Sequence, residues 1–232
     1  MKWLFVFTTV MFFYTAGCAQ NNPGNGKKTA SGNLAAKTPG NIGGPCEGCE
    51  AIYESPVPFD SLKEMVWLPD WNPDEPRIAI NGTVYNPDGT PAKNVIIYIY
   101  HTDQTGHYTA NANETGWGKR HGSLRGWMKT NEEGFYKFFT KRPAAYPGRT
   151  DPAHIHITIK EPGKNEYYID EFLFDDDPLL TEEKRKSLEN RGGSGVLKIL
   201  PHYVGRDILK SERDIYLGKN IPNYPGSKQM RK

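Results

Sequence analysis

The chain has 232 residues, and 29 Lys and Arg against 27 Asp and Glu give it a formal net charge of +2. This balance removes the electrostatic argument for nucleic-acid binding, and a mean hydropathy of −0.68 excludes a polytopic membrane protein. The 24 Gly and 18 Pro disfavour a helix bundle, because both residues interrupt helices, and favour short strands joined by turns.

The first 18 residues have the layout of an export signal. Lys2 precedes an apolar run over residues 3–14, which is too short to span roughly 30 Å of hydrocarbon comfortably, and small residues follow before Cys18. This ending resembles a bacterial lipobox, in which the Cys is lipidated. An ordinary cleaved signal is the alternative, because Thr15 is weaker there than Leu. We therefore expect a bacterial protein exported to the periplasm, outer membrane or cell surface and held to the membrane only by a lipid anchor.

Residues 19–45 contain hardly anything to bury, which predicts a flexible linker. Cys46 and Cys49 follow it. The lack of a second Cys pair disfavours a zinc site, and the acidic neighbours Glu47 and Glu50 oppose a reactive redox thiolate. A short disulfide formed in an oxidising compartment is the interpretation we favour.

From residue 77 onward, short apolar runs alternate with turn signals. The runs that predict strands are 78–85, 95–101, 135–139, 154–160, 167–174, 196–200 and 214–217. One clear helix is predicted at 181–190, capped by Thr181 and ended by Gly192 and Gly193. We therefore expect an all-β domain over residues 46–232, a single β-sandwich with few short helices.

The densest chemical signal is the pair His154 and His156. On a strand, residues i and i+2 face the same side, so these imidazoles form a natural bidentate metal site, although a solvent-facing pair fits the pattern as well. Two tyrosines lie in nearby loops: Tyr146 in a loop bounded by prolines, and Tyr108 after the second predicted strand. Loop tyrosines by themselves usually only pack.

The segment from residue 82 to residue 156 resembles the intradiol ring-cleavage dioxygenases. Six pieces in the family's order carry the resemblance: 82–84 with 88–92, 100–103 with 106–108, 124–127, 130–138, 140–147 and 152–156. In that family, two tyrosinates and two histidines hold a non-haem ferric ion. The resemblance implies that Tyr108, Tyr146, His154 and His156 are the iron ligands in a sandwich of the prealbumin type.

The resemblance also implies a reaction. O2 would open the ring of a catechol-type diol between its two hydroxyl-bearing carbons, which gives a muconate-type diacid. Hard ferric iron suits phenolate and imidazole donors. The diol would displace Tyr146, which then acts as a base, while Tyr108 and His154 stay bound. No reductant or organic cofactor is needed, which suits an exported enzyme.

Two positions depart from the family pattern. Asp151 stands where aromatic-ring members commonly have Arg, and Glu171 stands where Gln or Arg is usual. A carboxylate opposes negative charge that develops on the ring, whereas Arg stabilises it. Arg149 and Arg125 are our candidates for that catalytic role, with Arg142 as a third. The substrate, a catechol or a larger phenolic, is left open.

Two other classes of protein compete with the dioxygenase interpretation. A prealbumin-like binding module, including an inactive dioxygenase descendant, would explain residues 78–100 without a metal, but it would not explain the two tyrosines together with the paired histidines. A cupin would bind a metal through the His pair and Glu161, but the later cupin motif is absent from the sequence.

Overall fold

The computed structural model describes residues 41–69, 77–200 and 208–226. The predicted export signal with Cys18, and most of the predicted linker, lie outside the described residues. Ile42, near the end of that linker, packs into the hydrophobic core, so the folded part begins before residue 46. In the described part of the chain, no helix is long and apolar enough to cross a membrane.

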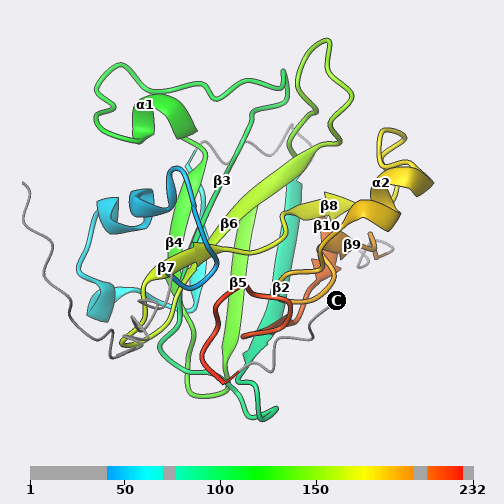
Figure 1. Cartoon of the computed structure of the whole chain (residues 1–232). Coiled ribbons are helices and arrows are strands. Elements are labelled where there is room, and N and C mark those ends of the chain that lie inside the picture. Colours follow the sequence, from blue (N-terminus) through cyan, green and yellow to red (C-terminus); the bar gives the residue numbers. More distant parts are fainter. Residues whose placement is uncertain (1–40, 70–76, 201–207, 227–232) are drawn as a thin grey trace, which may run out of the picture. The chain divides into compact units, whose positions relative to one another are not determined.

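Two β-sheets face each other across the core (Figure 1). The first sheet has the order β1 (Met65–Trp67), β5 (Phe135–Lys141), β2 (Arg77–Tyr85) and β10 (Ile208–Glu212), and β11 (Ile215–Tyr216) also pairs with β2. The second sheet has the order β4 (Arg125–Lys129), β3 (Ile96–His101), β6 (His154–Lys160), β8 (Phe172–Phe174) and β9 (Val196–Leu197), and β7 (Glu166–Tyr168) also pairs with β6. The predicted β-sandwich is confirmed.

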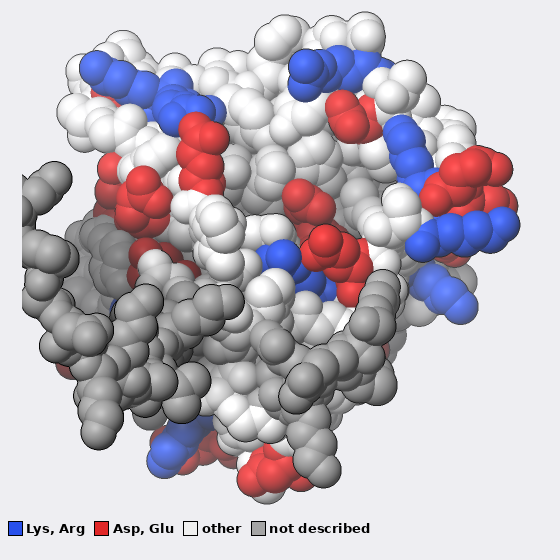
Figure 2. All heavy atoms as spheres, in the orientation of Figure 1, with Lys and Arg blue, Asp and Glu red and all other residues white. Residues whose placement is uncertain are grey.

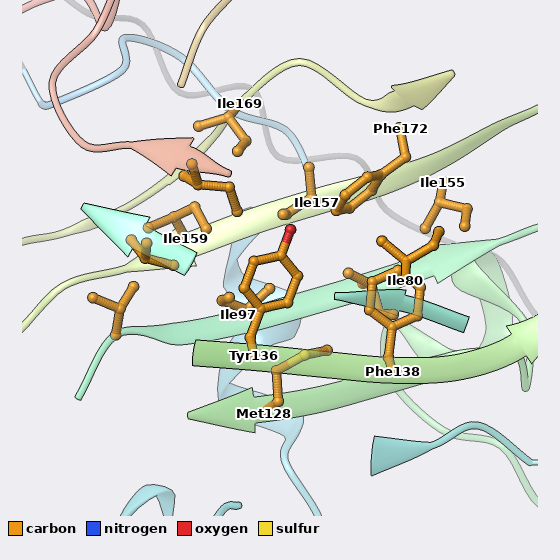
Figure 3. Close-up of a cluster of buried hydrophobic side chains, with 14 of the residues drawn as sticks. Ile80, Ile97, Met128, Tyr136, Phe138, Ile155, Ile157, Ile159, Ile169 and Phe172 are labelled. Atoms are coloured by element: carbon orange, nitrogen blue, oxygen red, sulfur yellow. The ribbon is translucent and has the colours of Figure 1, made fainter. Parts of the chain in front are cut away.

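The core fills the space between the sheets, because each strand buries alternate residues. From the first sheet, Tyr136 and Phe138 of β5 point inward, and Ile155, Ile157 and Ile159 of β6 meet them from the second sheet (Figure 3). The two histidines of β6 alternate with these isoleucines, so they lie on the outer face of the second sheet. Because the isoleucines of β6 must face the core, His154 and His156 must face outward.

Helical segments are few and short, as expected. They are the 3₁₀ helices η1 (Cys49–Glu54) and η2 (Phe59–Ser61) and the α-helices α1 (Gly118–His121) and α2 (Glu182–Ser187). Thr181 caps α2 as predicted, since its hydroxyl accepts a hydrogen bond from the Lys184 backbone N–H. The helix ends at Ser187, however, well before Gly192, so the predicted extent to residue 190 is wrong.

The predicted strand at 167–174 is two strands, β7 and β8. Residues 169–171 separate them. The backbone N–H of Asp170 donates to the Arg191 carbonyl and not to β6, and the Asp170 carboxylate accepts hydrogen bonds from the backbone N–H groups of Asn190 and Arg191. This interruption brings Glu171 to the start of β8, beside His156.

Candidate metal centre

The outward-facing histidines of β6 form the base of the site. Their Nε2 atoms lie 3.1 Å apart, and the two rings are nearly perpendicular, with 88° between their planes. This closeness follows from the two-residue period of the strand, because His154 and His156 leave the backbone on the same side.

Two tyrosines from separate loops complete the group. The Tyr108 hydroxyl lies 2.8 Å from His156 Nε2 and 2.5 Å from the Tyr146 hydroxyl. The Tyr146 hydroxyl lies 3.1 Å from His154 Nε2 and 3.5 Å from His156 Nε2. The structure thus brings together the four residues of the predicted ligand set, and we refer to them as the Tyr–His cluster.

A network of hydrogen bonds around Asp103 shapes the loop that carries Tyr108. The Asp103 carboxylate accepts bonds from the backbone N–H groups of Thr105 and His107 and from the hydroxyls of Thr105 and Thr109. Although burial raises the pKa of Asp103, these bonds outweigh it and lower the pKa to about 2. Asp103 is therefore ionised at neutral pH and holds the loop in one conformation.

The two tyrosine loops pack directly against each other. Gly106 has a φ of 77°, and a Cβ added there would lie within 2.2 Å of the Ala145 carbonyl oxygen. The Thr102 hydroxyl also donates to the Ala144 carbonyl. A close approach that only glycine permits therefore sets the distance between the loops of Tyr108 and Tyr146.

Both histidines present Nε2 to the tyrosines because their Nδ1 atoms have other partners. His154 Nδ1 lies 2.7 Å from the Pro152 carbonyl oxygen and donates to it, whereas His156 Nδ1 faces a Glu171 carboxylate oxygen at 3.6 Å. Carbonyl and carboxylate groups in these positions are typical behind metal-binding histidines, where they orient the ring.

Burial disfavours the charged forms of three members of the Tyr–His cluster. Burial raises the pKa of the Tyr108 and Tyr146 hydroxyls and lowers the pKa of His154. A bound cation reverses this preference for the phenols, because it stabilises phenolates. The cluster therefore has the donor chemistry of a site for a hard, highly charged metal ion, which prefers anionic oxygen.

Two hollows open next to the cluster, and His156 and Glu171 belong to both. One has a volume of about 390 Å³, and its lining includes Tyr146, Asp151, His154 and Lys184. The other has a volume of about 230 Å³, and its lining includes Cys46, Glu47, Tyr100 and Tyr168. The first hollow reaches three residues of the cluster, Tyr146, His154 and His156, so a small ligand can approach the cluster there, whereas the second reaches only His156.

Comparisons with known proteins decide the family. The family model Dioxygenase_C, described as Dioxygenase, matches residues 59–192, more than half of the chain. The chain belongs to the intradiol dioxygenases. The match begins at η2 and includes all four residues of the Tyr–His cluster.

Two curated intradiol dioxygenases match parts of the chain. Catechol 1,2-dioxygenase 1 of Acinetobacter lwoffii is 30% identical over 132 residues, which are 49% of this chain and 42% of that protein. The protocatechuate 3,4-dioxygenase beta chain of Burkholderia cepacia is 27% identical over 142 residues, 59% of each protein. The chain thus spans about half the length of the curated relatives that it matches.

Solved structures show the same fold. Catechol 1,2-dioxygenase of Acinetobacter radioresistens superposes with a TM-score of 0.54 at 16% identity, over 73% of this chain and 61% of that one. The enzyme of Acinetobacter sp. ADP1 gives a TM-score of 0.52 at 18% identity, over 71% of this chain and 61% of that one.

The arginines predicted to act in this intradiol dioxygenase lie in different places. Arg125 binds Glu54 and Glu114, each at 2.8 Å, and lines a separate hollow of about 470 Å³. Arg142 binds Asp176. The structure thus does not bring either to the cluster, since carboxylates hold both elsewhere. Arg149 is in the Tyr146 loop, and its charge favours the Tyr146 phenolate.

Residues of a cupin-type site do not assemble. Among the described residues, no three His, Cys, Asp or Glu side chains form a group that could hold a metal. Glu161, the third cupin ligand, accepts hydrogen bonds from the Tyr167 and Tyr224 hydroxyls instead. The cupin interpretation is therefore wrong. The donor groups that do converge are two histidines and two tyrosines, and a cupin site has no tyrosine ligands.

Tyr100, which no sequence pattern singles out, packs against the cluster. Its ring lies between His121 and His156, with ring centroids 3.7 and 4.5 Å away. The signal for it is strand pairing, because Tyr100 of β3 lies directly opposite His156 of β6. That pairing cannot be read from the sequence without knowing the order of the strands.

Proposed function

We propose that this protein is an active intradiol dioxygenase, which uses non-haem Fe(III) and O2 to open the ring of a catechol-type vicinal diol to a muconate-type diacid. The convergence of the two tyrosine hydroxyls and two histidine Nε2 atoms, 2.5 to 3.5 Å apart, supports this function most directly. Membership of the intradiol dioxygenase family supports it independently.

The donor set fits ferric iron. Tyr108, Tyr146, His154 and His156 would hold the ion through two hard anionic oxygens and two imidazoles, and the Pro152 carbonyl would orient the His154 imidazole. When bound, Fe(III) supplies the Lewis acidity that draws electron density from the chelated diol and makes its ring carbon reactive toward O2.

The two tyrosines have different surroundings, which indicates different roles. Tyr146 lines the 390 Å³ hollow, where a diol would enter; burial and the carboxylates of Glu171 and Asp151 raise its pKa, against the smaller opposite effect of Arg149, so its oxygen has a high affinity for a proton. Tyr108 lines neither hollow and contacts both Tyr146 and His156. We assign the Tyr146 oxygen as the base that accepts a proton from the incoming diol, and Tyr108 as a permanent ligand.

The substrate we propose is a diol without a carboxylate substituent, either a catechol or a larger phenolic. Asp151 and Glu171 border the 390 Å³ hollow, with Lys184 as the basic residue of its lining. On the face shown in Figure 2, acidic and basic side chains of the described residues are interspersed. Nearby carboxylates repel a carboxylate substituent on the ring.

We also propose that the protein is exported and anchored by a lipid on Cys18. The apolar run before Cys18 supports export. The disulfide between Cys46 and Cys49 supports it as well, because disulfides persist in oxidising compartments outside the cytoplasm.

One experiment tests the function. The purified protein is loaded with Fe(III), its visible spectrum is recorded, and O2 uptake is then measured on a panel of catechols. A tyrosinate-to-iron charge-transfer band and uptake of one O2 per diol are expected. Tyr108→Phe and Tyr146→Phe should shift or abolish the band, whereas Tyr216→Phe, a half-exposed tyrosine stacked on Tyr85, should not.

Two outcomes count against this function. A wild-type protein without the band when iron is present would contradict the ligand assignment. A protein with the band but without O2 uptake on any diol would be an inactive, iron-binding descendant.

A further inference from the structure

The His156 imidazole is held by an aromatic stack on its face. The Tyr100 ring lies over it with 4.5 Å between centroids and 18° between planes, and His121 covers the other face of Tyr100 at 3.7 Å and 5°. Tyr100 is therefore the middle ring of a stack of three, and the last ring of the stack belongs to the Tyr–His cluster.

The far end of this stack is anchored in the protein. His121 ends α1 and is 5% exposed, and its Nδ1 lies 2.8 Å from the hydroxyl of Tyr98, which is fully buried. Because Tyr98 is two residues before Tyr100 on β3, the same strand holds both the middle ring and the anchor of the outer ring.

The disulfide loop closes over the outer ring. Gly48, between Cys46 and Cys49, lies so close to His121 that an added Cβ would be 3.0 Å from its Nε2. Cys49 is buried, and its Sγ accepts a hydrogen bond from the Thr158 hydroxyl at 3.8 Å. Since Thr158 follows His156 by two residues on β6, the loop contacts both the stack and the strand of the histidine.

The two histidines of the cluster are therefore oriented by different means. His154 has a direct hydrogen bond at 2.7 Å from Nδ1 to the Pro152 carbonyl. The corresponding partner of His156, Glu171, is 3.6 Å away, which is beyond normal hydrogen-bond length. The ring face of His156, however, is covered by Tyr100, and this contact restricts the tilt of the imidazole.

We propose that Tyr100 is a positioning residue that fixes the plane of the His156 imidazole, and that the Cys46–Cys49 disulfide loop holds this stack in place through His121. The inference rests on the proposed function, because it takes His156 as an iron ligand. An imidazole binds a metal well only when the metal lies near its ring plane, so a tilted ring would weaken the site.

The experiment compares Tyr100→Leu, which removes the stack, with Tyr100→Phe, which keeps it. Tyr85→Leu is the matched control, because Tyr85 stacks on Tyr216 and pairs with β11, away from the cluster. Two quantities are measured: the Fe(III) dissociation constant with the charge-transfer band, and the NMR signals of the His156 ring in the metal-free protein.

Tyr100→Leu should weaken Fe(III) binding by about 10-fold or more, the usual effect of removing an orienting partner. It should also shift the band and the His156 ring signals. Tyr100→Phe should stay within about 2-fold of wild type, since a phenyl ring restores the stack. Gly48→Ala and the double variant Cys46→Ser/Cys49→Ser should shift the His121 and His156 signals together. These variants also test whether the stack positions His156 if Tyr100→Leu does not fold.

The proposal and the function on which it rests can fail separately. If Tyr100→Leu changes iron binding and the His156 signals no more than Tyr85→Leu does, Tyr100 does not position the ring. If the disulfide variants leave the His121 signals unchanged, the loop does not hold the stack. If the wild-type protein binds no iron while Tyr100→Leu still moves the His156 signals, the stack stands and the proposed function fails.

Discussion

At the scale of single residues, Gly106 controls the geometry of the candidate metal centre. Gly106→Ala should destabilise the protein and weaken iron binding, because the new methyl group meets the Ala145 carbonyl oxygen and pushes the Tyr108 and Tyr146 loops apart. Gly89→Ala is the matched control, since Gly89 also has a positive φ, 85°, but nothing lies within 4 Å of its added Cβ.

Both glycine variants bear the strain of a left-handed alanine, of order 1–3 kcal/mol. The difference between them isolates the effect of the close approach, and we expect Gly106→Ala to lose at least about 1 kcal/mol more. Thermal or denaturant unfolding measures this difference, and equal losses in the two variants would show that the loops can separate without cost.

Asp151 is the residue whose charge we expect to select the substrate. Asp151→Arg should lower the KM for a carboxylated diol such as protocatechuate by about 10-fold relative to unsubstituted catechol, because it turns a repulsive charge at the 390 Å³ hollow into an attractive one. Asp60→Arg, on η2 and outside both hollows, is the control for overall charge. An unchanged KM ratio would mean that Asp151 does not face the bound ring.

At the scale of elements, the Asp103-centred loop should lose its order in acid. Asp103 has a pKa of about 2 in the folded protein against an ordinary 3.8, because its hydrogen bonds outweigh burial. The folded loop therefore binds fewer protons than the open loop, and its stability, complete above pH 4, should fall as the pH drops from about 4 to 2. NMR signals of the 102–109 backbone measure this change, and Asp103→Asn should remove the pH dependence in that range.

A comparison of the predicted and observed strands shows which of them the sequence alone can predict. The strands β2, β3, β5 and β6 follow from apolar runs bounded by turn signals, and alternation within β6 places His154 and His156 on one face. The sequence does not predict strand β4, because Gly126 interrupts its apolar pattern. The break between β7 and β8 depends on Asp170 bonding to residues 190 and 191, which are distant in sequence.

The site shows the same division between local and distant contacts. Spacing predicts the His pair, but nothing local brings Tyr108 and Tyr146 to it, so only the family resemblance pointed to the four residues together. The stack of His121, Tyr100 and His156 needs the pairing of β3 with β6 and the docking of α1. The position of the Arg125 side chain likewise depends on Glu54, which is 71 residues away in the sequence.

At the scale of the whole molecule, we propose that attachment to a membrane depends on the sulfur of Cys18. If Cys18 is lipidated, Cys18→Ser should move the protein out of the membrane fraction, because the acyl chains that would hold it there can no longer be attached. Fractionation and mass measurement of the mature N-terminus check this prediction. Iron binding by the Cys18→Ser protein should equal that of the wild type, because residues 41–226 supply the whole Tyr–His cluster. A wild-type protein that is already soluble and begins beyond Cys18 would instead indicate an ordinary cleaved signal.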